Sequence, residues 1–112
     1  MLIKTFGLPL NLTTDYVGGW QDLNIGAAHP SRWSYVLDWS TGIATSYDAS
    51  ITIEGRNDVS GHPVTLGTGT IDGATGTLFK SFDYPVQQVR TKIDLNDLVS
   101  AVINSINIIT DK

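Results

Sequence analysis

A strict two-residue alternation in the stretch RWSYVLDW, residues 32–39, limits the fold of this chain more than any other feature. The side chains on one side of this stretch are large and apolar: Trp33, Tyr35, Leu37 and Trp39. Successive side chains of a β-strand point to opposite faces of its sheet, so this period indicates a strand with one face on a core. The pattern therefore predicts a half-buried strand, with Trp33 and Trp39 inside the protein.

The same period returns further along the chain, between clusters of turn-forming residues. Alternation recurs in residues 51–54, 64–66 and 89–95. Asn57, Asp58 and the glycines around them suit a turn between the first two of these segments. Gly67 and Gly69 lie between strand-like residues, and we interpret them as glycines of a further hairpin.

Short strands that are separated by turn residues at this spacing are typical of a β-sandwich or a barrel. We therefore predict an all-β, single-domain antiparallel β-sandwich over residues 1–112, jelly-roll-like, with about seven or eight strands. Its core should contain six apolar members of the alternating segments: Trp33, Leu37, Ile51, Ile53, Val89 and Ile93.

The C-terminal segment allows two interpretations. One short helix would explain an apolar stripe at helical spacing: Leu95, Leu98, Val99, Val102, Ile103 and Ile106. A turn near Asn96 and Asp97 followed by a final strand would explain the many β-branched residues and the alternation of Ile106 with Ile108. We favour the strand and keep the helix as the alternative.

The N-terminal residues 1–11 form a candidate arm. Its apolar side chains are Leu2, Ile3, Phe6, Leu8 and Leu10. Pro9 cannot donate a ladder hydrogen bond, so this segment is at best an edge strand. An exposed apolar edge invites pairing with another chain, and we expect these five residues to form a partner interface. The alternative is that the arm closes its own sandwich.

Composition excludes several classes of partner. The chain has 112 residues, a net charge of −4 and only seven Lys and Arg, which is too few for the basic face of a general nucleic-acid binder. An anionic membrane surface is disfavoured for the same reason. No stretch approaches the ~18 apolar residues of a membrane span. With no cysteine, the chain has no disulfide and no thiolate metal site.

Residues with catalytic or metal-binding chemistry are few and scattered. His29 and His62 each stand beside a proline, and Glu54 is the only glutamate. Neither a zinc-ligand cluster nor a nucleophile elbow nor a phosphate loop is present in the sequence. Most aspartates fall at expected turns, where they stabilise the turn itself. We therefore predict no catalytic residue, no cofactor and no metal.

Calcium binding by loop aspartates is the alternative for the metal prediction. The three residues concerned are Asp48, Asp58 and Asp72, but no D-x-D spacing supports a shared site. Two aromatic residues outside the expected core are candidates for a different role. Tyr16 and Trp20 are the side chains that we expect to face a sugar, if this chain binds one.

Three phrases carry a resemblance to a known group of proteins. They are WSYVLDW, ITIEGRND followed by PVTLGT, and YPVQQVRTKID, and together they run from about Trp33 to Ile93. In their strands and turns they resemble β-sandwich modules of the discoidin-like kind, which also occur among tailed-phage virion proteins. His62-Pro63 stands near where those modules commonly have an aromatic residue. The resemblance therefore implies a fold and a structural role, and no ligand site.

Two functions follow as expectations. The first is a non-enzymatic capsid decoration (cement) protein of a phage, which stabilises the head by binding the major capsid protein. Copies of the chain would also associate with one another, for example as trimers, after assembly in the host cytoplasm into the virion. The alternative is a phage tail accessory or a receptor- or carbohydrate-binding module.

Overall fold

The computed structural model describes residues 2–5, 9–23, 32–41, 44, 46–57, 61–83 and 85–110. All regular structure in these ranges is β-strand. The strands are β1 (Leu2–Thr5), β2 (Leu10–Leu12), β3 (Tyr16–Val17), β4 (Gln21–Asp22), β5 (Trp33–Ser40), β6 (Ala49–Arg56), β7 (Val64–Ile71), β8 (Thr75–Phe82), β9 (Gln88–Asp94) and β10 (Ala101–Thr110). The predicted all-β class is confirmed.

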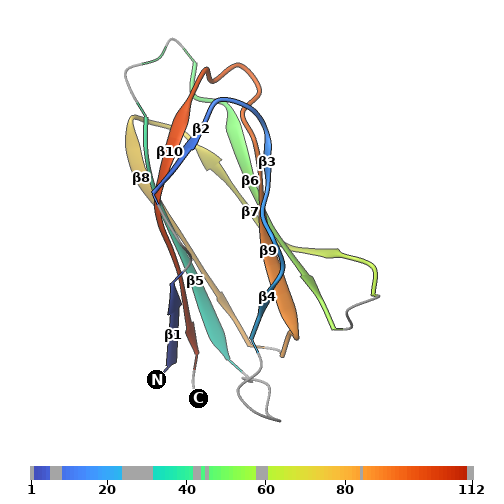
Figure 1. Cartoon of the computed structure of the whole chain (residues 1–112). Coiled ribbons are helices and arrows are strands. Elements are labelled where there is room, and N and C mark those ends of the chain that lie inside the picture. The colour runs from blue at the N-terminus through green and yellow to red at the C-terminus, as the bar shows by residue number, and fades with distance from the viewer. Residues whose placement is uncertain are drawn as a thin grey trace.

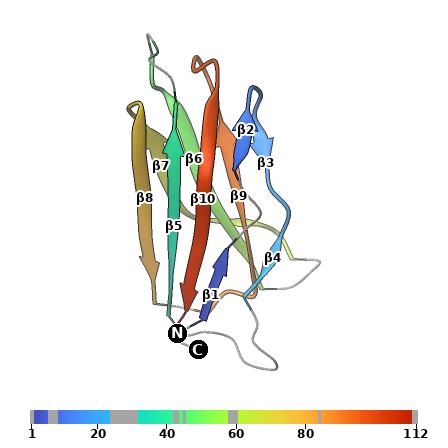
Figure 2. The ribbon, with the colours of Figure 1, turned by 60° about the vertical axis from the view of Figure 1, so that its left-hand side comes forward.

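These strands form two antiparallel sheets that face each other (Figure 1). Sheet A has the order β1-β10-β5-β8, and β2 also pairs with β10. Sheet B has the order β3-β9-β6-β7, and β4 also pairs with β9. Leu2 pairs with Thr110, so the two ends of the described chain lie together at one end of the sandwich (Figure 2). The predicted antiparallel β-sandwich is therefore confirmed.

The core lies between the sheets and is built from the inward members of the alternating strands. In β5 the residues Trp33, Tyr35, Leu37 and Trp39 are buried, as the alternation predicts. The six predicted core residues are all at most 2% exposed. Trp33 stacks on Phe82 of the neighbouring β8, with 4.3 Å between ring centroids. Burying such large apolar side chains supplies most of the driving force for folding.

A polar contact also crosses this core. The hydroxyl groups of Tyr35 on β5 and Thr91 on β9 share a hydrogen bond, which joins sheet A to sheet B. Burial raises the pKa of the Tyr35 phenol well above its ordinary value. The hydroxyl group therefore stays neutral inside the core, and the bond satisfies two groups that would be costly to bury unpaired.

The predicted hairpin at Gly67 and Gly69 is wrong, because both residues lie inside β7. They pair with Ile53 and Ile51 of β6. A Cβ on Gly69 would lie 2.6 Å from the side chain of Leu78, so the inward glycine leaves room for that leucine. Glycine inside a strand often marks such a close approach.

The N-terminal quarter of the chain contributes to a difference in the number of strands. Four short strands stand there, which raises the count above the predicted seven or eight. β1 and β2 belong to sheet A, whereas β3 and β4 belong to sheet B, so the chain crosses between the sheets after Leu12. Asp15 accepts a hydrogen bond from the backbone of Leu95 near this crossing.

The C-terminal segment is the favoured strand, and no helix occurs in the described part of the chain. The expected turn is confirmed: Asn96 has a φ of 54°, a left-handed conformation that asparagine tolerates. The register of β10 against β5 shifts between Ile103 and Ser105, as at a β-bulge. This shift puts Ile103 and Ile106 on the same side, which explains why their spacing mimics a helix. No helix of the described residues is long and apolar enough to span a membrane.

The candidate N-terminal arm pairs with its own sheet. Leu2 and Ile3 lie in β1, and Leu10 begins β2 and is half-buried against the core. β1 and β2 both pair with β10 in this chain, as edge strands. Phe6 and Leu8 lie outside the described residues. That these five residues also contact a partner stays a prediction.

Candidate functional site

The outer face of sheet B carries a row of polar and charged side chains from two neighbouring strands, β6 and β9. Its side chains alternate with the core residues of the same strands: Thr52, Glu54 and Arg56 on β6, and Gln88, Arg90 and Lys92 on β9. The register of the two strands sets Glu54 opposite Arg90 and Arg56 opposite Gln88. Opposite charges therefore face each other at Glu54 and Arg90, whereas Arg56 faces a neutral amide.

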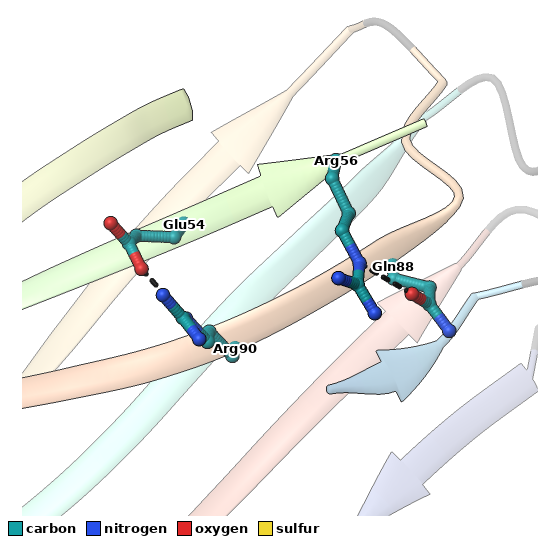
Figure 3. A network of polar contacts seen from close by, with 4 residues as sticks. All are labelled: Glu54, Arg56, Gln88 and Arg90. Atoms are coloured by element: carbon teal, nitrogen blue, oxygen red, sulfur yellow. Dashed lines mark hydrogen bonds and ion pairs between the residues drawn. The ribbon is translucent and has the colours of Figure 1, made fainter. Parts of the chain in front are cut away.

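Three hydrogen bonds connect these side chains. Arg90 Nε donates to Glu54 Oε1 at 2.7 Å, and Arg56 Nε donates to Gln88 Oε1 at 2.7 Å (Figure 3). Gln88 Nε2 then donates to Asp22 Oδ1 of β4, also at 2.7 Å. Arg90 and Glu54 form the salt bridge of this network. Arg56 differs from Arg90, because its Nε partner is a neutral amide and no described carboxylate forms a salt bridge with it.

Trp20 lies over both arginines. The guanidinium carbons of Arg56 and Arg90 are 4.2 and 4.5 Å from the centre of the indole ring. Such cation–π contacts are worth roughly 0.5–2 kcal/mol each. They hold the planar ring and the two planar cations in a fixed arrangement on this face, where Trp20 remains half-buried.

The backbone on either side of Trp20 is attached to sheet B. Gly18 N donates to Thr91 O at 2.8 Å, and Leu23 N donates to Gln87 O at 2.9 Å. Leu23 is fully buried and anchors the segment in the core. The indole is thus placed by two short strands, β3 and β4, that both pair with β9.

The structure separates the two aromatic residues that the sequence suggests as sugar-facing. Trp20 belongs to the outer face of sheet B, whereas Tyr16 is half-buried and packs against the core. The arginines beneath Trp20 were not among the predicted site residues. A signal for them exists, because the alternation that buries Ile53 and Val89 turns Glu54, Arg56, Gln88 and Arg90 outward.

A cleft of about 200 Å³ opens at the end of this face, beside Arg56. Its described lining comprises Gly55, Arg56, Asn57, His62, Val64, Leu66, Pro85 and Val86. A Cβ on Gly55 would lie 2.6 Å from Leu66 and 2.9 Å from Val86, so glycine lets both side chains close over β6. Asn57 Oδ1 accepts a hydrogen bond from Gln87 N at 3.1 Å and ties one wall to the start of β9.

The outer face of sheet A has a different character. Phe79 on β8 is 59% exposed and stands opposite Val36 of β5. Asp38 accepts hydrogen bonds from the hydroxyl groups of Thr77 and Ser105. The outer face of sheet A thus has an exposed phenyl ring at Phe79. Its carboxylate at Asp38 is already hydrogen-bonded within the sheet.

The loop aspartates were the alternative for a metal site. Asp48 Oδ1 accepts a hydrogen bond from Asp97 N at 3.0 Å, and Asp48 O accepts one from Asn96 Nδ2. Asp48 therefore stabilises the turn before β10, the role that the sequence predicts for turn aspartates. Asp58 lies outside the described residues. Within the described ranges no three His, Asp or Glu side chains gather into a group that could hold a metal ion.

Comparisons with known proteins give a fold and no family. No family model matches the chain, and no curated protein matches it. Several solved structures are similar in fold. The insecticidal delta-endotoxin Cry8Ea1 of Bacillus thuringiensis matches 95% of this chain and 20% of its own, with a TM-score of 0.59 and 15% identity.

Two further similar structures contain carbohydrate-binding modules. BiXyn10A CBM1 matches 93% of this chain and 74% of its own, with a TM-score of 0.56 and 12% identity. The CBM22-1 and GH10 modules of the Clostridium thermocellum xylanase Xyn10B, complexed with xylohexaose, match 83% of this chain, with a TM-score of 0.55 and 8% identity. The match covers 19% of that xylanase chain. The likeness shows a shared β-sandwich fold.

Proposed function

We propose that this chain is a non-enzymatic β-sandwich module that binds carbohydrate on the outer face of sheet B. The observation that carries the proposal is the placement of Trp20. Its indole is half-buried over the guanidinium groups of Arg56 and Arg90, inside a network of hydrogen-bonding side chains. A planar ring fixed in this way is a platform on which a sugar ring can stack.

The chemistry of the face suits a polyhydroxylated ligand. The π-face of an aromatic ring carries partial negative charge, which attracts the weakly positive C–H groups of a sugar. Sugar hydroxyls both donate and accept hydrogen bonds, and the amide of Gln88, which is bonded to Arg56, carries both a donor and an acceptor group. Because the network already fixes these side chains, little side-chain entropy remains to be lost on binding.

The fold is compatible with this proposal. Two similar structures are described as carbohydrate-binding modules, and one of them is complexed with xylohexaose. At 8% and 12% identity these two structures show a shared fold alone. The proposal therefore depends on the outer face of sheet B around Trp20, which we call the Trp20 face.

A pair of variants tests the proposal. Trp20→Ala removes the platform on sheet B, and Phe79→Ala removes the exposed aromatic ring of sheet A. We expect wild type and Phe79→Ala to bind the same glycans on an array, and Trp20→Ala to lose that binding while keeping its circular dichroism spectrum. If no glycan is bound, or if Phe79→Ala alone loses binding, the proposed function is wrong.

A structural subunit of a virion is the second candidate, as a capsid decoration protein that binds the major capsid protein and copies of itself. The long strands β7 and β8 favour it. Each has eight residues and pairs on one side only among the described strands, β7 with β6 and β8 with β5. Unpaired edges of this length can pair with another chain. Phe79 and Val64 add exposed apolar surface to them.

Self-association separates this candidate from the first. A subunit that assembles through these edges should form oligomers in light scattering, and Phe79→Glu should dissociate them. A wild-type chain that stays monomeric at all concentrations and does not bind phage heads in negative-stain micrographs would contradict this role.

A further inference from the structure

We infer that the ligand of the proposed carbohydrate-binding face is an acidic saccharide, whose anionic group enters the cleft beside Arg56 and binds that residue. This inference rests on the proposed function and adds the chemical class of the sugar. The anionic group is a carboxylate, as in a uronic acid, or a sulfate ester.

The state of Arg56 is the first observation. Arg56 and Arg90 both lie against Trp20, but the charge of Arg90 is compensated by Glu54 at 2.7 Å. Arg56 Nε donates its hydrogen bond to the neutral amide oxygen of Gln88. No salt bridge joins Arg56 to a carboxylate of the described residues. Its terminal nitrogens therefore keep donors for an outside acceptor, and a guanidinium group suits a carboxylate or a sulfate.

The lining of the cleft is the second observation. Arg56 and His62 line it together with the Asn57 amide, and no acidic residue appears among its described lining. The whole chain has 11 acidic and 7 basic side chains, whereas the described lining of this cleft has Arg56 and no carboxylate. Such a local excess of positive charge attracts an anion to this cleft in a protein that otherwise repels it.

The shape of the cleft is the third observation. Leu66 and Val86 close over Gly55, and Val64 and Pro85 add further apolar surface. Apolar walls exclude water from a bound charge pair and strengthen it relative to a fully exposed one. Arg56 also lies against the indole, so a single sugar unit can stack on Trp20 and place its anionic substituent at the cleft.

The experiment compares glycans that differ only in charge. A glycan array should include uronate-containing glycans beside their carboxyl-reduced counterparts, and sulfated glycans beside their desulfated ones. We expect binding to one of the acidic glycans and a loss of at least about tenfold in affinity for its neutral counterpart, the effect of losing a charge-assisted hydrogen bond. The member of the pair that binds identifies carboxylate or sulfate.

Variants assign the effect to Arg56. In calorimetric titrations with the bound acidic glycan, Arg56→Gln should weaken binding by about tenfold or more, and Arg56→Lys should restore part of it. Lys80→Gln removes one positive charge from β8 of sheet A, outside the described lining of the cleft, and should change affinity by less than about twofold. Thermal melting checks that each variant is folded.

The outcomes separate the two proposals. Equal affinity for acidic and neutral members of a pair overturns the acidic-saccharide inference but leaves carbohydrate binding intact. Equal losses in Arg56→Gln and Lys80→Gln also overturn the inference, because the effect would then come from net charge. No binding to any glycan of the array overturns both.

Discussion

Tyr35 and Thr91 are the residues whose chemistry is least expected in this core, because they place two hydroxyl groups between apolar sheets. Tyr35→Phe should lower the free energy of unfolding by about 1–3 kcal/mol, since the buried Thr91 hydroxyl loses its partner. Urea denaturation measures the change. Adding Thr91→Val should cost less than the sum of the two single changes, and strict additivity would contradict a shared bond.

The same phenol makes stability depend on pH at the alkaline end. Burial raises the folded-state pKa of Tyr35 above the ordinary value of about 10 that it has in the unfolded chain. Its contribution to stability is therefore complete below about pH 10 and is lost as the pH rises further. Wild type should lose more unfolding free energy than Tyr35→Phe between about pH 8 and pH 11. Equal losses in the two proteins would show that Tyr35 is not the group responsible.

Side-chain burial gives the sharpest test of the strand registers. Ile53 is 0% exposed, whereas Val99 is 81% exposed. Ile53→Ala should cost about 2–5 kcal/mol of unfolding free energy by opening a cavity, and Val99→Ala should cost less than about 0.5 kcal/mol. Similar melting temperatures for both variants would mean that the inward face of β6 is assigned wrongly.

Among the elements, β8 depends on a glycine that touches a tryptophan. A Cβ on Gly76 would overlap the ring of Trp39, whereas nothing lies within 4 Å of a Cβ on Gly19. Gly76→Ala should destabilise the protein by about 1–3 kcal/mol through overpacking and should change tryptophan fluorescence. Gly19→Ala, the matched control, should leave both unchanged. A Gly76→Ala protein as stable as the control would contradict the packing of β8 on β5.

A deletion tests whether the N-terminal arm stabilises its own sheet or contacts a partner. β1 pairs with β10 at four positions, and Leu10 packs half-buried against the core. Removing residues 1–10 should lower the melting temperature while the strand spectrum remains, because only an edge of sheet A is lost. A deletion variant that melts like wild type but no longer self-associates would instead make the arm a partner interface.

The sequence predicts the elements that alternate cleanly and misses those set by tertiary contacts. The alternation of β5, β6 and β9 is visible because each buries one face. Gly67 and Gly69 mislead because both lie inside β7, and at Gly69 the reason for glycine is the side chain of Leu78 across the core. The β-bulge near Ile103 cannot be seen locally either, because it is defined against β5.

At the scale of the whole molecule, the candidate site is assembled by the pairing of strands that are far apart in the sequence. Trp20 could be suggested from sequence as a solitary aromatic, but its partners Arg56 and Arg90 are 36 and 70 positions away along the chain. They meet because β3 and β4 pair with β9, and β9 pairs with β6. Local periodicity places the arginines outward, yet only the order of strands in sheet B brings all three residues together.

The most direct test of the central claim, that the Trp20 face of sheet B is the binding surface, is a chemical-shift map. An isotope-labelled sample is titrated with a glycan that the wild type binds, and amide and side-chain shifts are followed. The largest shifts should occur at the Trp20 indole, at Arg56 and at Gln88, with sheet A around Phe79 unchanged. Shifts that cluster on sheet A, or that leave Trp20 and Arg56 unmoved at saturation, would contradict the claim.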